Sequence, residues 1–319
     1  ELRETICRYL YQARGVNCEP EQIVIGAGNE YLLMLLSTVL GKNRKIAFEN
    51  PTYRQAYRLF ENLSYDTCVV EMDRKGMCVD KLRKSGAEIA YVMPSHQYPL
   101  GIVMPIKRRM ELLKWAAEEE ERYIIEDDYD SEFRYKGKPI PALQGFDRED
   151  KVIYIGTFSR SIAPSIRISY LVLPKNLLKA YNEKSRFLSS TVSRVDQLII
   201  QQFIERGYYE RHLNKMRALY KSRHDIMVNE LKPLLKYCSI SGENAGVHLL
   251  LTFIEGKEEK ILTQKAKEQG IKVYGLSTYD IKKKEKEQAV ILLGYANMSE
   301  EKIIQAIQTL TNAWKEYLE

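Results

Sequence analysis

A corner rich in hydroxyl and basic side chains follows the β-branched run at residues 152–155. Its members are Gly156, Thr157, Ser159, Arg160, Ser161 and Arg167. Hydroxyl groups, backbone N–H groups and a fixed guanidinium are the donors that bind a phosphate dianion, and arginine binds it through two parallel hydrogen bonds. The corner therefore predicts a phosphate site.

A second cluster is the acidic run at residues 123–133, where a β-branched stretch ends in several carboxylates. A parallel strand with this ending places its acids at the carboxyl edge of a sheet, where α/β proteins bind ligands. The number of acids would suit a metal ion, but no histidine is near, and solvated acids give the same pattern. This run predicts a ligand-facing edge rather than a metal site.

Residues 26–29 form a glycine turn between a short strand, 22–25, and an apolar helix, 31–40. A strand that passes through glycines into a helix presents unpaired N–H groups and the positive end of a helix dipole, which suits an anion. An ordinary strand-to-helix turn has the same sequence, so the turn by itself leaves both interpretations open.

Bulk composition favours a cytoplasmic α/β protein. The chain has 319 residues, 45% of them hydrophobic, and no apolar run approaches the ~20 residues of a membrane span. Its five cysteines are odd in number and scattered, which predicts neither a disulfide framework nor a zinc site. The net charge is +6, with basic residues gathered at 206–223 and 282–286; solvated surfaces explain these clusters better than nucleic-acid contacts.

Strand and helix patterns alternate along the chain. Strands are expected at 45–48, 88–93, 152–155 and 168–173, with helices at 1–15, 55–62 and 107–119. Helix is expected from 174 to 202 and again, as one long charged helix, from 206 to 236. Residues 137–147 read as a loop. We expect a large domain at 1–205, of which 1–18 could pack on the small domain, and a small α+β domain at 206–319.

Four local motifs resemble one family. They are the glycine turn, Pro-Ser-His-Gln-Tyr-Pro at 94–99, Glu-Asp-Asp-Tyr-Asp-Ser-Glu-Phe at 126–133, and Gly-Thr-Phe-Ser-Arg-Ser at 156–161 with its downstream arginine. Together they resemble the fold-type I pyridoxal-phosphate (PLP) aminotransferases, and most closely the effector domain of MocR-type transcriptional regulators of the GntR family. The resemblance spans residues 2–314. It implies a mostly parallel, seven-stranded sheet flanked by helices, and a homodimer.

The resemblance also assigns roles to residues. It places Gly28, Asn29, Thr157, Ser159 and Arg167 on the phosphate of PLP. It stacks Tyr53 over the pyridine ring, pairs Asp127 with the ring nitrogen and directs Tyr129 to the phenolic oxygen. A carboxylate at the ring nitrogen keeps that nitrogen protonated. His96 is interpreted as a structural histidine in preference to a proton carrier.

Two positions depart from the aminotransferase pattern. Arg160 stands where the family has the lysine that forms the Schiff base, and a guanidinium, protonated up to a pKa above ~12, cannot condense with an aldehyde. Tyr98 stands where ordinary aminotransferases have asparagine, which favours the regulator branch. Three explanations of Arg160 stay open: a salt bridge to the ligand, a site adapted to another phosphorylated effector, or an engineered change.

The expected effector is an amino acid or a PLP adduct, but two missing arginines argue against γ-aminobutyrate. Regulators of this family that respond to γ-aminobutyrate hold its carboxylate with arginines at positions that correspond here to Gln55 and Thr278. Their absence removes a bidentate grip on a carboxylate. Leu292 likewise replaces the carboxylate-binding arginine of the aminotransferases.

The sequence therefore predicts the effector-sensing domain of a cytoplasmic regulator. It would bind PLP, pyridoxamine phosphate or a PLP–amino acid adduct without a covalent bond, and would contact DNA only through a missing N-terminal winged helix-turn-helix domain. A catalytic aminotransferase is the alternative, against which Arg160 counts because the same lysine would shuttle the proton. A structural dimer module with an inactive pocket is a third possibility.

Overall fold

The computed structural model describes residues 1–135, 140–185, 187–242, 245–282 and 288–319. The chain divides into two compact units. Of the described residues, the larger unit holds Glu1–Tyr98, Ile102–Glu132 and residues 140–213. The smaller unit holds Pro99–Gly101, residues 133–135 and Asn214–Glu319. Most of the lysine run at 282–286 and part of the predicted loop at 137–147 lie outside the described residues.

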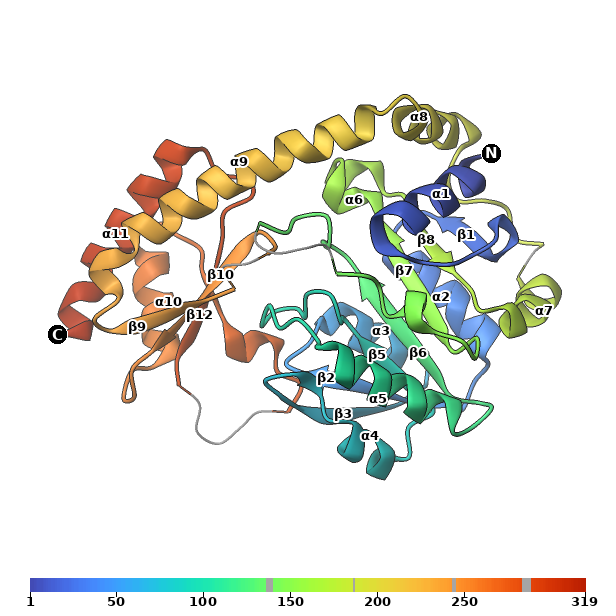
Figure 1. The fold of residues 1–319 in the computed structure, drawn as a ribbon. Coiled ribbons are helices and arrows are strands. Elements are labelled where there is room, and N and C mark those ends of the chain that lie inside the picture. Colours follow the sequence, from blue (N-terminus) through green and yellow to red (C-terminus); the bar gives the residue numbers. More distant parts are fainter. Residues whose placement is uncertain (136–139, 186, 243–244, 283–287) are drawn as a thin grey trace. The chain divides into compact units, whose positions relative to one another are not determined.

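The larger unit alternates strands and helices, as the sequence pattern predicts (Figure 1). Its strands are β1 (Ile23–Gly26), β2 (Lys45–Asn50), β3 (Asp66–Asp73), β4 (Gly76–Met77), β5 (Ile89–Val92), β6 (Tyr123–Asp128), β7 (Val152–Thr157) and β8 (Ser169–Val172). Its helices are α1 (Leu2–Arg14), α2 (Asn29–Leu40), α3 (Arg54–Asn62), α4 (Val79–Ser85), α5 (Ile106–Ala117), α6 (Phe158–Ser161), α7 (Lys175–Lys184) and α8 (Arg194–Glu205).

One sheet, in the order β1-β8-β7-β6-β5-β2-β3-β4, forms the centre of this unit. Strands β7, β6, β5, β2 and β3 run parallel to one another, and β8 is antiparallel to both of its neighbours. These seven strands confirm the expected mostly parallel sheet. The two-residue strand β4, antiparallel to β3, adds an eighth.

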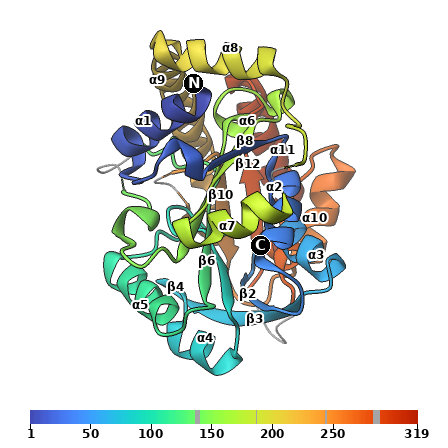
Figure 2. The ribbon, with the colours of Figure 1, turned by 90° about the vertical axis from the view of Figure 1, so that its right-hand side faces the viewer.

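Helices pack on both faces of the sheet. Figure 2 shows β6 between α5 on one side and α2 with α3 on the other. A core cluster of fully buried side chains, among them Val92, Trp115 and Ile124, lies where α4 and α5 meet the strands. Gly15 caps the C-terminal end of α1 in the left-handed conformation that glycine adopts without strain. Within this unit α1 contacts β1 and α8.

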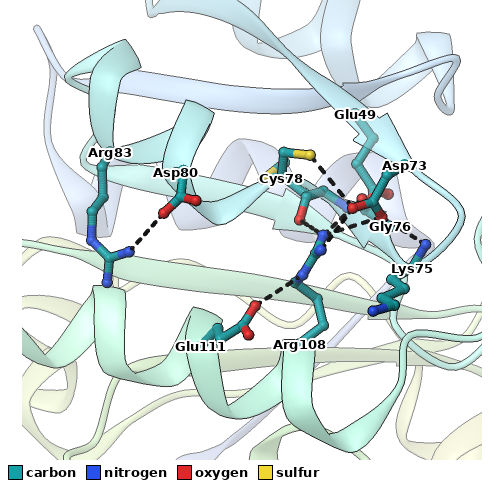
Figure 3. A network of polar contacts seen from close by, with 10 residues as sticks. Glu49, Asp73, Lys75, Gly76, Cys78, Asp80, Arg83, Arg108 and Glu111 are labelled. Atoms are coloured by element: carbon teal, nitrogen blue, oxygen red, sulfur yellow. Dashed lines mark hydrogen bonds and ion pairs between the residues drawn. The ribbon is translucent and has the colours of Figure 1, made fainter.

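A polar network ties the β3–β4 hairpin to α5 (Figure 3). Arg108 Nη2 lies 2.7 Å from Asp73 Oδ2, and Arg108 Nη1 donates to the Met77 carbonyl at 2.6 Å. Glu49, at the end of β2, accepts from the Met77 N–H at 3.1 Å, and burial raises the pKa of this carboxyl to about 7. The network fixes the strand end that leads into Tyr53.

The smaller unit contains an antiparallel sheet in the order β11-β12-β10-β9. Its elements include, in chain order, β9 (Cys238–Ser241), β10 (His248–Phe253), α10 (Glu259–Glu268), β11 (Tyr274–Gly275), η5 (Leu276–Tyr279), β12 (Val290–Gly294) and α11 (Glu300–Leu318). Trp314 of α11 is fully buried and donates its indole N–H to the Leu262 carbonyl at 2.9 Å. The α+β character expected for the C-terminal part is confirmed.

Some boundaries differ from expectation. The helix expected at 174–202 is two helices, α7 and α8, because residues 185 and 187–193 are not helical. The helix expected at 206–236 is α9 (Tyr208–Glu230) followed by a 3-10 turn at Lys232–Leu234, where Pro233 cannot donate an N–H. Within the described ranges, every helix is too short or too polar to span a bilayer.

Candidate functional site

The predicted cofactor residues all lie in the larger unit, where strand ends and loops carry them. Asp127 is on β6 and Thr157 ends β7, the next strand in the sheet, with Asp127 in register with Ile155. Gly28 is the residue before α2, and Tyr53 is the residue before α3. Gly28 follows strand β1, and Tyr53 follows strand β2. Parallel strands place their carboxyl ends at one edge of a sheet, which explains how residues far apart in sequence can meet.

Asp127 has one oxygen in use and one without a partner. Its Oδ2 accepts a short hydrogen bond from the Tyr91 hydroxyl. Its Oδ1 is buried and has no hydrogen-bond partner among the described residues. Burial raises the pKa of the Asp127 carboxyl to about 7, although the bond from Tyr91 acts in the opposite direction. A buried acceptor without a partner favours a ligand that donates a hydrogen bond to it.

Two further buried polar atoms without partners among the described residues belong to predicted phosphate-binding residues. They are Ser159 Oγ, on α6, and Asn29 Oδ1, in the first turn of α2; neither has a partner within the residues that the structure places. Thr157 caps α6, because its hydroxyl oxygen accepts from the Ser159 N–H at 3.1 Å, and it accepts from the Ser169 hydroxyl at 2.8 Å. The corner thus keeps one hydroxyl for structure and one available.

Arg167 lies directly over Gly28. A Cβ atom on Gly28 would stand 2.3 Å from Arg167 Nη2, and Gly28 has φ +94°, so any side chain there would both clash and be strained. Arg167 itself adopts the left-handed region, with φ 49°. Its Nη2 is paired with Glu30 Oε2 at 2.7 Å, and both side chains are about half exposed. The glycine turn and the basic corner therefore meet, as a phosphate site requires.

Three tyrosines connect this end to the acidic run. The ring of Tyr98 lies 6.4 Å from that of Tyr53 and 5.9 Å from that of Tyr129, edge to face in both cases. Burial, followed by the charge of Glu30, raises the pKa of Tyr53 to about 12. Burial and the Asp130 carboxylate hold the pKa of Tyr129 well above its ordinary value, whereas the charge of Arg160 acts in the opposite direction on both groups.

Arg160 itself is exposed on α6. Across the described residues Arg160 forms no hydrogen bond or ion pair. Its positive charge acts on the hydroxyl groups of Tyr53 and Tyr129, whose pKa values it lowers. The predicted effector residues lie in different units: Gln55 is exposed on α3, and Thr278, in η5, donates to the Gly275 carbonyl at 2.7 Å.

Two other acids of the run at 123–133, Glu126 and Asp128, are bonded to structural partners. Glu126 accepts from the Leu143 and Gln144 N–H groups at 2.7 and 2.8 Å. Asp128 Oδ2 accepts from Arg14 Nε at 2.8 Å and from the Tyr154 hydroxyl at 2.6 Å. In the described ranges no three acidic, histidine or cysteine side chains are placed to hold a metal ion.

Several residues of the site were not found by sequence reasoning. Tyr91 and Arg14 bond to the acids from other elements, and no local pattern indicates these contacts. The position of Glu30 could have been inferred from the sequence, because an acidic residue is stabilised in the first turn of a helix. His96, interpreted as structural, is buried and contacts Asp130 and Tyr129.

Comparison with known proteins agrees with the geometry. Residues 1–310 match the family Aminotransferase class I and II. The uncharacterized HTH-type transcriptional regulator YdeL of Bacillus subtilis is 44% identical over 99% of this chain and 68% of its own length. The pyridoxine biosynthesis transcriptional regulator PdxR of Corynebacterium glutamicum is 32% identical over 87% of this chain and 60% of its own.

Among solved structures, a kynurenine aminotransferase of Pyrococcus horikoshii, in complex with PMP, superposes with a TM-score of 0.85. It is 26% identical, and the match covers 100% of this chain and 80% of that one. The chain spans about two thirds of the regulators that it matches. The chain belongs to the aminotransferase class I and II family, in the branch whose members are MocR-type transcriptional regulators.

Proposed function

We propose that this chain is the effector-sensing domain of a transcriptional regulator and that it binds PLP, or a derivative of PLP, without a covalent bond. Two Bacillus subtilis relatives, which match 99% and 98% of the chain, are named as HTH-type transcriptional regulators, and a third relative, which matches 87% of the chain, is named for pyridoxine biosynthesis. Contact with DNA would belong to a winged helix-turn-helix part of a longer protein. The proposal concerns the ligand site of the larger unit.

The observation that carries the proposal is the unpartnered Asp127 Oδ1. A buried acceptor without a partner costs about 1–3 kcal/mol. A protonated ring nitrogen would satisfy it, and Tyr91 already holds the other oxygen of the carboxylate in place. The side chains present therefore fit a pyridine ring at this position.

The phosphate would be held at the other end of the site. Arg167 would contribute its guanidinium, Ser159 its available hydroxyl group, and Gly28 and Asn29 the start of α2. Thr157 would contribute its hydroxyl by giving up the 3.4 Å bond that it donates to the Ile168 carbonyl. Gly28 supports this assignment because a Cβ atom at this position would displace the guanidinium from where it now lies. Glu30 now holds Arg167, so a bound phosphate would share or displace this ion pair.

Between these ends, Tyr53 would stack on the ring while Tyr98 and Tyr129 border it. Bound here, the group offers the protein a phosphate dianion, a ring nitrogen and a ring oxygen to recognise. Arg160 would stand near the remaining substituent as a permanent positive charge. Gln55, in the larger unit, would border an effector that does not depend on a bidentate carboxylate grip.

The deciding experiment separates covalent from non-covalent binding. The protein would be titrated with PLP and with pyridoxamine phosphate by calorimetry, and the PLP complex would then be reduced with borohydride and weighed by mass spectrometry. We expect saturable binding of both compounds and no added mass. Reduction of the matched variant Arg160→Lys should add the mass of one phosphopyridoxyl group.

Two results would overturn the proposal. A reduced adduct in the unaltered protein would show that another amine forms the bond and would support the aminotransferase alternative. The absence of heat and saturation with either compound, in a protein with native circular dichroism, would indicate an inactive pocket.

Homodimerisation is a separate part of the proposal. The side chains of Val195, Leu198 and Ile199 on α8 are 67%, 47% and 56% exposed, an apolar stripe that a second copy of the chain could cover. Sedimentation equilibrium should give twice the mass of one chain. The double variant Val195→Asp, Ile199→Asp should give the mass of a single chain.

A further inference from the structure

A buried histidine joins two residues of the acidic run. His96 lies in the loop after β5, and its Nδ1 is 3.0 and 2.9 Å from the two carboxylate oxygens of Asp130. The hydroxyl oxygen of Tyr129 lies 3.0 Å from the same Nδ1. The side chains of His96 and Asp130 are only 4% and 2% exposed. One nitrogen thus serves two partners in a water-poor environment.

The chemistry of these groups fixes the position of one proton. An ionised carboxylate can only accept, so the nitrogen between its two oxygens must carry hydrogen. A nitrogen that carries hydrogen cannot accept a bond from the Tyr129 hydroxyl. Tyr129 must therefore accept in a three-centre bond from Nδ1–H, and its own O–H proton points elsewhere.

The Tyr129 hydroxyl also keeps that proton. Burial and the neighbouring Asp130 carboxylate hold its pKa well above the ordinary value. The group is a donor with a defined direction, and the ring of Tyr98 lies beside it at 5.9 Å. A donor of this kind requires an acceptor.

We propose that Asp130 and His96 are positioning residues that turn the Tyr129 hydroxyl proton toward a hydrogen-bond acceptor on the ligand. The inference rests on the proposed function and makes it more specific. The ligand class is a pyridine phosphate with an oxygen on the ring, ionised or otherwise able to accept, next to Tyr129. A ring without that oxygen leaves the Tyr129 donor unpaired.

The first test measures the tautomer in the protein without ligand. Long-range 1H–15N correlation spectra of histidine-labelled protein report which ring nitrogen carries hydrogen, and the variant His96→Gln identifies the His96 signals among the four histidines. We expect hydrogen on Nδ1, in a neutral or a cationic ring. In Asp130→Asn the amide donates to Nδ1, so the hydrogen should move to Nε2. A neutral His96 protonated only on Nε2 in the unaltered protein would overturn the inference.

The second test measures selectivity by calorimetry. Pyridoxamine phosphate is compared with its 3-deoxy analogue, which lacks only the ring hydroxyl. We expect the unaltered protein to bind the hydroxylated compound about tenfold more tightly, because a hydrogen bond to a charged acceptor is lost with the oxygen. Tyr129→Phe, Asp130→Asn and His96→Gln should each reduce that ratio to about one.

A matched control comes from the smaller unit. His224 Nδ1 is bound to Asp225 Oδ1 at 2.9 Å, and Asp225→Asn should leave the ratio near tenfold. A ratio that persists in both Asp130→Asn and His96→Gln would refute the positioning role while leaving the proposed function standing. Equal binding of both compounds by the unaltered protein would do the same. If neither compound binds, the proposed function fails together with the inference.

Discussion

Neighbouring carboxylates on β6 have opposite surroundings. Side chains alternate between the two faces of a strand, so Glu126 and Asp128 share one face and Asp127 lies on the other. On the first face both oxygens of Glu126 and the Oδ2 of Asp128 have bonded partners. On the second face Asp127 has Tyr91 on Oδ2 and no partner, within the described residues, on Oδ1.

The difference in bonded partners shows that buried carboxylates have two roles in this strand. Where the partners are present, the carboxylates join elements of the fold: Asp128 connects β6 to α1 and β7. Where a partner is lacking, burial of the acceptor costs free energy, and a ligand that donates a hydrogen bond to the acceptor would offset that cost. Residues of one type, adjacent in one strand, are thus assigned to architecture or to binding by what the neighbouring elements supply.

The largest expected effect comes from breaking the bonded face. Arg14→Met would leave Asp128 buried without its counter-charge, and such a loss costs about 3–5 kcal/mol of folding free energy. Urea unfolding measures it. The matched control, Arg8→Met, removes the exposed pair of Arg8 with Glu205 and should cost less than about 1 kcal/mol. Equal losses in the two variants would contradict the contrast between the faces.

The next effect comes from the other face. Asp127→Asn keeps the shape of the side chain and removes its charge, so we expect ligand binding to weaken by about 2 kcal/mol, roughly thirtyfold. Calorimetry with pyridoxamine phosphate measures it. Asp225→Asn, in the smaller unit, is the control and should bind normally. Unchanged affinity in Asp127→Asn would remove Asp127 from the site.

The pH dependence of stability sharpens the comparison further. The pKa of Asp127 is raised to about 7 in the folded protein, so the folded state binds more protons than the unfolded state between the ordinary carboxyl pKa and about 7. Stability should therefore fall as pH rises through this window, by up to about 1.4 kcal/mol per unit for this group. Glu126 and Glu132, whose pKa values are also raised to about 7 by burial, act in the same direction.

Asp127→Asn should flatten this slope without abolishing it. Urea unfolding of the ligand-free protein at several pH values between about 5 and 8 gives the two slopes. Equal slopes in the variant and the unaltered protein would mean that Asp127 does not titrate in this range.

The smallest effect concerns Arg167. Glu30→Gln would release the guanidinium from a half-exposed ion pair, and such pairs are worth about 0–1 kcal/mol. We expect phosphate-ester binding to tighten by up to about fivefold at low salt, with a smaller gain at high salt. Glu19→Gln, which removes the exposed pair with Lys175, should change nothing. Weaker binding in Glu30→Gln would indicate that Glu30 supports the site.

Local patterns were enough to predict the parts of the site that lie within single segments. The glycine turn before α2, the hydroxyl-rich corner after β7 and the acidic end of β6 each have the structure that their own residues favour. The order of alternating strands and helices likewise predicted the sheet. These features depend on residues close together in the chain.

Contacts between distant segments could not be predicted in this way. Arg14 and Asp128 are 114 positions apart, and Tyr91 and Asp127 are 36 apart. Neither pair has a spacing that a helix or strand period would indicate. The break between α7 and α8 was missed for another reason: residues 185–193 include serines and threonine, which compete with helix through their own side-chain bonds, as Ser190 does with Val192.

The first helix has a practical consequence for anyone shortening this protein. Arg14 is its last residue, and that guanidinium also donates to the Ser95 hydroxyl and the Ile140 carbonyl. A fragment that begins at Gly15 would lose the Arg14 bonds to three separate segments of the chain. Fragments intended for crystallisation or ligand screening should therefore start before Leu2.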